Sequence, residues 1–272
     1  MTLQMQLRIK SILRCASCAA LICPALALSS GLATDHPSTR LPTNPPPSAQ
    51  LHYTIKADRS GLTLQGDATV NWQLAESNST QTYSVNTETR AAIFGKILQA
   101  DSRGVIDDFG LAPDQYDEKP RNKSGTQTHF DRQSKHITFS ESKENYPLIG
   151  GEQDRTSVVW QLVSMARAAP NNFIPKSEWN FFVAGRRDAE KWTFTVEENV
   201  TLATPLGNLH TVHIVKAPPP DSKDQRLDIW LAPGLEWYPV RLKFSDADGD
   251  TIDQRLDLIK NNSQQTSHEV TP

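Results

Sequence analysis

The stretch of sequence that decides the fold occupies residues 226–259 and reads RLDIWLAPGLEWYPVRLKFSDADGDTIDQRLDLI. Apolar and polar residues alternate in its first part, where Ile229 and Leu231 share one face. A period of two predicts a β-strand with one wet face. A second alternating run, 240–244, follows Pro239, and proline is tolerated at the start of a strand. The stretch therefore predicts successive strands of a β-meander.

The acidic turn DADGD joins two of these strands and raises the question of a calcium site. Asp246, Asp248 and Asp250 fall at the first, third and fifth positions of an EF-hand loop. Thr251 stands where that loop needs glycine, and Asp257 stands where it needs glutamate. Asp-Gly is also a common hairpin turn, because glycine tolerates a positive φ. We expect a hairpin here and no bound metal.

The same alternation recurs outside this stretch, in LHYTIKA (51–57), DATVNWQL (67–74) and HIVKA (213–217). Gly-, Pro- and Asp-containing turns separate the alternating runs. We therefore expect a β-rich domain over residues 51–260.

One segment, QDRTSVVWQLVSMARAAPNN (153–172), breaks the pattern. Its apolar residues recur at helical spacing at Val158, Leu162, Met165 and Ala169. Asp154 can accept the free N–H groups of a first helical turn, and Pro170 can end the helix. The fold class predicted is mainly β: a single curved antiparallel sheet, or an open or half barrel, with one principal amphipathic helix near 154–169.

The N-terminus has the pattern of a secretory signal peptide over residues 1–33. A basic start precedes an apolar run from about Cys15 to Leu28, and small residues then offer cleavage sites. The run is shorter than the roughly 20 residues that a spanning helix needs. We expect a cleaved leader, no stable membrane span after cleavage, and a periplasmic protein. An uncleaved anchor and a lipidated cysteine are the alternatives.

Segments of low complexity flank the expected domain. Residues 34–50 are rich in Pro, Ser and Thr and predict a stiff linker, whereas the polar residues 261–272 predict a disordered tail. All the cysteines, Cys15, Cys18 and Cys23, lie in the leader. The exported domain would therefore have neither a disulfide nor a thiol nucleophile.

Charge disfavours partners that are polyanions. The formal net charge is −3, and loss of the three basic residues Arg8, Lys10 and Arg14 with the leader lowers it to −6. A mildly acidic chain has no net attraction for nucleic acid or for an anionic lipid surface.

The sequence contains no Gly-x-Ser-x-Gly, His-Glu-x-x-His or glycine-rich phosphate motif. His210 and His213 lie three apart in an expected strand, so they face opposite sides and do not form a metal pair. We therefore assign no catalytic residue, metal site or cofactor. Asp131 and Asp154 are the carboxylates that a polymer hydrolase would use, if the fold paired them.

Several fragments, in order along the chain, together carry a family resemblance. They are GLAPDQYDE (110–118), FD (130–131), GGEQDRTSVVWQL (150–162), TPLGNLHTVHI (204–214), DIWLAP (228–233) and YPVRLKFSDADGD (238–250). This set resembles domain of unknown function 3108, a family of exported bacterial proteins. The resemblance implies a β-rich envelope protein and supplies no catalytic residues. A looser similarity, at the level of fold only, is to half-barrel carriers of lipoproteins.

Three functions remain open. The first is a noncatalytic periplasmic protein that binds a lipid or another apolar envelope component in the concavity of the sheet. Residues that could line such a cavity are Trp72, Trp160, Trp230 and Trp237. The second function is an envelope-polymer hydrolase with paired carboxylates, and the third is a protein-interaction scaffold that uses a sheet edge.

Overall fold

The computed structural model describes residues 40–77, 79–218, 222 and 224–261. Over these residues the chain forms one 15-stranded sheet, one α-helix and two short 3-10 helices. The elements are β1 (Ala49–Arg59), β2 (Leu62–Ser77), β3 (Thr80–Ala91), β4 (Gly95–Asp107), β5 (Gly110–Pro120), β6 (Thr126–Asp131), β7 (His136–Phe139), β8 (Ser142–Pro147), β9 (Gln153–Asp154), α1 (Ser157–Ala168), η1 (Pro170–Asn172), β10 (Glu178–Ala184), β11 (Ala189–Thr204), β12 (Gly207–Lys216), β13 (Arg226–Leu231), η2 (Pro233–Leu235), β14 (Pro239–Ser245) and β15 (Thr251–Asn261).

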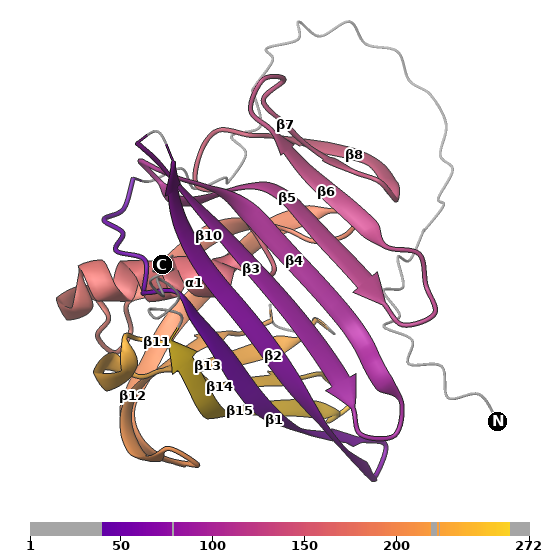
Figure 1. Ribbon diagram of the computed structural model, residues 1–272, viewed down its shortest axis with the longest axis vertical. Coiled ribbons are helices and arrows are strands. Elements are labelled where there is room, and N and C mark those ends of the chain that lie inside the picture. The colour runs from indigo at the N-terminus through magenta and orange to yellow at the C-terminus, as the bar shows by residue number, and fades with distance from the viewer. Residues whose placement is uncertain (1–39, 78, 219–221, 223, 262–272) are drawn as a thin grey trace, which may run out of the picture. The chain divides into compact units, whose positions relative to one another are not determined.

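The sheet is a meander whose first and last strands pair with each other. Its order is β8-β7-β6-β5-β4-β3-β2-β1-β15-β14-β13-β12-β11-β10-β9, and every pair except β9–β10 is antiparallel. The two strands at the ends of this order, β8 and β9, follow one another along the chain. The sheet therefore opens in the middle of the sequence, just before α1 (Figure 1). The predicted fold class, an open antiparallel sheet with one helix, is confirmed.

The stretch 226–259 forms the predicted meander of β13, β14 and β15. Ile229 of β13 lies opposite Leu242 of β14, which in turn lies opposite Gln254 of β15. The turn between β13 and β14 contains η2, followed by Glu236 and Trp237 with φ values of 52° and 61°. Left-handed backbone at two successive non-glycine residues makes the tight reversal that leads into Pro239.

Helix α1 is confirmed, but it has no wet face along most of its length. Residues 157 and 158 and residues 160 to 166 are buried, polar Gln161 and Ser164 among them. Gln161 Nε2 donates to the Phe109 carbonyl, and the Leu111 N–H donates to Gln161 Oε1 at 2.8 Å. Because Phe109 and Leu111, at the start of β5, satisfy the amide of Gln161, this polar side chain can be buried.

Residues 40–48 contain no helix or strand, yet they are held against the domain. Asn44 N donates to the Ser164 carbonyl at 2.9 Å, and the carbonyls of Pro46 and Pro47 accept hydrogen bonds from Trp72 and Tyr238. Proline lacks an N–H but keeps a carbonyl acceptor, so a Pro-rich stretch can dock through its oxygens. This differs from the solvated linker expected there, and β1 begins at Ala49. The leader, residues 34–39 and residues 262–272 lie outside the described residues.

The buried apolar side chains form three clusters. One joins the first strands of the sheet, Trp160 of α1 and residues of β13, β14 and β15, and a second joins the opposite side of α1 to β10–β14. The third has seven buried members on β4–β7 and on β10 and β11, and it spans the opening of the sheet: Ala100, Tyr116, Phe130, Ile137, Phe139, Ala184 and Ala189.

Candidate functional site at the opening of the sheet

Side chains from the two edges of the sheet pack against each other across its opening. We call this place the seam, defined by the third apolar cluster together with Tyr146, Leu148 and Phe182, which pack on it. Tyr146 of β8 meets Phe182 of β10 edge to face, with ring centroids 5.5 Å apart, and Phe139 packs on Tyr146 at 6.0 Å. Since β8 pairs only with β7, and β9 only with β10, no strand ladder among the described residues crosses the seam.

Polar contacts flank the aromatic rings of the seam. Thr128 Oγ1 donates to the Gly185 carbonyl at 2.7 Å. Arg186 lies 3.6 Å from a Glu118 oxygen and 3.2 Å from a Glu141 oxygen. These few bonds hold together edges that elsewhere in the sheet are joined by backbone ladders. The seam is therefore the place where the sheet can separate with the smallest loss of backbone hydrogen bonds.

A buried polar network lies where the described chain passes from β9 to α1. The Tyr83 hydroxyl lies 3.0 Å from Ser102 Oγ, and Ser102 donates to Asp154 Oδ2 at 2.5 Å. The other carboxylate oxygen accepts the N–H groups of Thr156 and Ser157 at 2.8 and 2.7 Å, and Ser157 Oγ accepts the Asp154 N–H. Asp154 thus caps the first turn of α1, as predicted, and ties it to β4.

Burial governs the protonation of this carboxyl group. Desolvation raises the pKa of Asp154 to about 6, although the hydrogen bonds from Ser102, Ser157 and Thr156 act in the opposite direction. The side chain is fully buried. The group is therefore close to half protonated just below neutral pH, inside the domain.

The two carboxylates considered for hydrolysis have different environments. Asp131 ends β6 at an exposed hairpin, where it accepts the backbone N–H groups of Gln133 and Ser134. Asp154 is buried, and the polar atoms it contacts are hydroxyl and backbone N–H groups. Each carboxylate accepts backbone hydrogen bonds within its own turn, and no contact between described residues joins Asp131 to Asp154.

Of the four tryptophans predicted to line a cavity, Trp72 and Trp160 stack on each other in the core. The rings of Trp72 and Trp160 are parallel within 6°, with centroids 4.4 Å apart, and Tyr238 meets Trp160 edge to face at 6.2 Å. Trp72 Nε1 donates to the Pro46 carbonyl at 2.9 Å. The first cluster contains both indoles, and their lining of a ligand cavity stays a prediction.

Trp230 belongs to the same first cluster, whereas Trp237 packs against the second. Trp230 is held between His213 of β12, stacked at 4.4 Å, and the Arg241 guanidinium of β14, 4.5 Å from the ring centroid. Trp237 is half-buried beside Phe173 in the second cluster, with ring centroids 6.1 Å apart. The structure thus places Trp72, Trp160 and Trp230 in the first cluster and Trp237 against the second.

The two side chains that flank Trp230, His213 and Arg241, are each bonded to a carboxylate. Asp228 accepts hydrogen bonds from His213 and Arg226, and Asp253 accepts two from Arg241. Desolvation raises the pKa of Asp228, but the hydrogen bonds from His213 and Arg226 outweigh it and lower the pKa to about 2.

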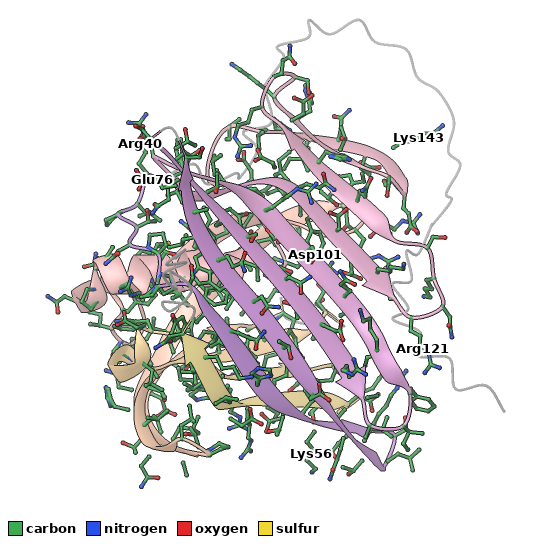
Figure 2. All side chains as sticks on the ribbon, in the orientation of Figure 1. Arg40, Lys56, Glu76, Asp101, Arg121 and Lys143 are labelled. Atoms are coloured by element: carbon green, nitrogen blue, oxygen red, sulfur yellow. The ribbon has the colours of Figure 1, made fainter. Side chains whose placement is uncertain are left out.

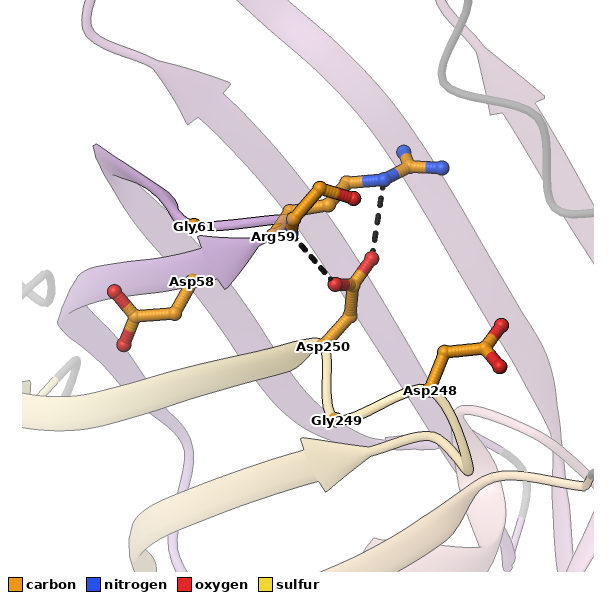
Figure 3. Close-up of a pocket in the computed structure, with 7 residues that line it drawn as sticks. Asp58, Arg59, Gly61, Asp248, Gly249 and Asp250 are labelled. Carbon is orange, nitrogen blue, oxygen red and sulfur yellow. Dashed lines mark hydrogen bonds and ion pairs between the residues drawn. The ribbon is translucent and has the colours of Figure 1, made fainter.

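The acidic turn forms a hairpin that also bonds to the β1–β2 turn. Asp246 Oδ1 accepts the N–H groups of Asp248 and Asp250, which closes the turn between β14 and β15. The Asp250 carboxylate accepts the Ser60 N–H at 2.8 Å and lies 3.2 Å from Arg59 Nε (Figure 3). These residues line a hollow of about 330 Å³. No group of His, Cys, Asp and Glu suited to a metal occurs among the described residues.

Sequence reasoning missed the seam. Tyr116 and Phe130 stand in alternating strands and would be assigned to a core, but nothing in one sequence shows that they meet Ala184 and Ala189.

Within the described part of the chain, no helix is both long and apolar enough to cross a membrane.

Comparison with known proteins places this fold. No protein with a curated description matches the chain. A solved β-barrel-like DUF1849 protein from Brucella abortus covers 80% of this chain and 98% of its own at 11% identity, with a TM-score of 0.51. A protein with a YmcC-like fold from Bacteroides fragilis covers 82% and 99% at 11% identity, with a TM-score of 0.38. An outer membrane lipoprotein-sorting domain from Vibrio parahaemolyticus covers 82% and 88% at 6% identity, with a TM-score of 0.26.

At these identities the first likeness shows the fold alone, and the other two are too distant to support an argument. The ordered fragments noted in the sequence have firmer support. Residues 49–257, which run from the start of β1 into β15, match the family described as "Protein of unknown function (DUF3108)". The chain therefore belongs to the DUF3108 family.

Proposed function

We propose that this protein is a noncatalytic periplasmic envelope protein that binds an apolar, lipid-like ligand at the seam. The observation that carries the proposal is the way the sheet ends: an aromatic cluster, with few polar bonds, joins two edges that have no ladder between them. An acyl chain inserted there would exchange ring contacts for chain contacts and break no strand pairing. The leader expected over residues 1–33 supports export.

The polar network at the start of α1 supports binding rather than hydrolysis. Paired-carboxylate chemistry needs two carboxyl groups on either side of a bound polymer. Asp154 is enclosed by the protein and is engaged as a helix cap. A buried carboxyl group that bonds the first turn of α1 and Ser102 of β4 is suited to holding the helix in place.

The scaffold alternative has one observation in its favour. Strand β8 is a free sheet edge with mostly exposed side chains, and a partner strand could add to it. A peptide paired with β8 would gain backbone hydrogen bonds, whereas an acyl chain would gain apolar contacts, so a screen of peptides beside lipids separates the two functions.

A cross-link across the seam tests the proposal. Tyr146→Cys with Phe182→Cys places one thiol on each side, and Phe139→Cys with Tyr146→Cys places both on the same side. Each pair is made with the three native cysteines changed to serine, and a short bismaleimide joins the thiols. Fatty acids and lysophospholipids are then screened by thermal shift, since a ligand that binds the folded state raises its midpoint.

We expect a saturable rise in midpoint with the uncross-linked protein and with the same-side link, and none with the link across the seam. Equal ligand responses in all three forms would overturn the seam as the binding site. A silent lipid screen, with stabilisation by peptides alone, would favour the β8 scaffold.

A further inference from the structure

The turns at one end of the long strands carry exposed apolar side chains. Consecutive antiparallel strands place the turns β1–β2, β3–β4 and β5–β6 at the same end of the sheet. In the β3–β4 turn, Ile93 is 79% exposed and Phe94 is 41% exposed, although both are large and apolar. Leu62, beside the β1–β2 turn, is 60% exposed. Isolated exposed leucines are ordinary, but two successive large apolar residues exposed at a hairpin tip mark a candidate contact surface.

Basic residues gather beside this tip. Arg121 N donates to the Ile97 carbonyl, so the β5–β6 turn lies against β4, and the Arg121 guanidinium sits over the Phe94 ring at 5.5 Å. Lys96, Lys119, Arg121 and Lys123 line a hollow of about 480 Å³. Figure 2 shows Arg121 at the same end of the strands as Lys56.

Most of this positive charge is not neutralised by the protein. Lys96 pairs with Glu88, which Arg90 also contacts. Lys119, Arg121 and Lys123 are exposed, and none of them forms an ion pair within the described part of the chain. The acidic turn at this end, 246–250, belongs to strands on the other side of β1 and is engaged with Arg59. Three free cations therefore surround an apolar tip in a protein whose net charge is negative.

We propose that this basic tip, formed by Ile93, Phe94, Lys119, Arg121 and Lys123, docks on an anionic phospholipid bilayer. The apolar pair would enter the boundary between headgroups and acyl chains, and the three cations would contact headgroup phosphates. Charge complementarity selects an anionic surface, and the neighbouring Ile-Phe pair selects a bilayer over a soluble polyanion, because a polyanion offers nothing for apolar side chains to enter. The net charge of the chain gave no sign of this surface, because it sums the basic residues of the tip with the acidic residues of the rest of the chain.

Co-sedimentation with vesicles tests the proposal on the full chain. Phosphatidylcholine vesicles are compared with vesicles that also contain phosphatidylglycerol, at low and high salt. Lys119→Gln with Lys123→Gln removes charge, and Ile93→Ser with Phe94→Ser removes the apolar pair. Lys176→Gln with Ile174→Ser changes an exposed lysine and an exposed isoleucine outside the tip, in the segment before β10. Residues 1–39 are common to all variants, so any binding through them cancels in the comparison.

The wild type should bind the phosphatidylglycerol vesicles. The charge variant should bind on the order of 20-fold more weakly at low salt, given the usual contribution of each basic residue at an anionic surface. The apolar variant should lose the fraction that resists salt, and the control variant should match the wild type. Equal binding by all variants would overturn the proposal. So would full competition by inorganic phosphate or dextran sulfate with no loss in the apolar variant, which would assign the tip to soluble anions.

The experiments can disprove the docking surface and the ligand site at the seam independently of each other. Protein cross-linked across the seam should still bind the vesicles, because the tip lies in other turns. Loss of vesicle binding with an intact lipid-induced thermal shift would remove the docking surface and leave the proposed ligand site in place.

Discussion

At the scale of single residues, two buried carboxyl groups contribute to stability with opposite dependence on pH. The folded pKa of Asp154 is raised to about 6, so its contribution is fully present below the unfolded pKa of 3.8 and is lost as pH rises through 6. The folded pKa of Asp228 is lowered to about 2, so its contribution is present above 3.8 and is lost as pH falls through 2. Burial dominates the first group, whereas His213 and Arg226 dominate the second.

Asp154→Asn is predicted to become relatively more stabilising as pH rises. The amide oxygen can still accept hydrogen bonds from Thr156 and Ser157, but the side chain no longer ionises. Between pH 4 and pH 7 the difference in unfolding free energy should move toward the variant by on the order of 2–3 kcal/mol. Urea denaturation at several pH values measures it. A difference that does not change with pH would show that folding does not shift the pKa of Asp154.

Asp228→Asn should show the reverse. It removes the charge that His213 and Arg226 contact, so it should lower the unfolding free energy near pH 7 by up to about 2 kcal/mol. The loss should shrink as pH falls from 4 toward 2, where the wild-type carboxyl group also becomes neutral. A constant loss down to pH 2 would mean that the variant perturbs packing around Trp230 rather than the ion pair.

At the scale of elements, α1 is held from every side of its central turns. Leu162 is fully buried in the second cluster, so Leu162→Asp should lower the unfolding free energy by several kcal/mol, about 3 or more. Ala168→Asp, at the partly exposed end of the helix, is the matched control and should cost less than about 1 kcal/mol. Similar melting temperatures for the two variants would contradict the burial of the Leu162 face.

The segment 40–48 is tied to the end of that helix by one side chain. Arg167 donates to the carbonyls of Asn44 and Pro45 and pairs with Glu236. Arg167→Ala should therefore increase hydrogen exchange at the Asn44 amide, which bonds to the Ser164 carbonyl, and lower the unfolding free energy by about 1–2 kcal/mol. Exchange-mass spectrometry checks both the site and its extent. Unchanged protection of that amide would show that Arg167 does not hold the segment.

The elements that sequence predicted are those with a local signal. The alternation around Ile229 and Leu242 and the helical spacing of Val158 and Leu162 each come from one short stretch. The docking of residues 40–48 has no such signal. Its composition is that of a solvated linker, but the contacts made by its backbone depend on residues such as Trp72, far along the chain.

At the scale of the whole sheet, the order of strands could be predicted only in part. Neighbours in sequence pair as neighbours in space, as a meander implies, from β1 to β8 and from β9 to β15. The pairing of β1 with β15, and hence the position of the opening, needs contacts between residues about 200 apart, such as Ile55 with Gln254. Of the candidate site, the Asp154 cap was within reach of sequence reasoning and the seam was not.

The central claim is that the sheet opens at the seam, between edges that side chains alone join, and binds its ligand there. Native-state hydrogen exchange with and without a saturating lysophospholipid tests this claim most directly. We predict that amides of β8 and β9 exchange by local opening, that amides in the β1–β15 pair exchange only with global unfolding, and that the lipid slows exchange around Phe139, Tyr146 and Phe182. Exchange at the seam as slow as in β1 and β15, with lipid protection confined to other strands or absent, would contradict it.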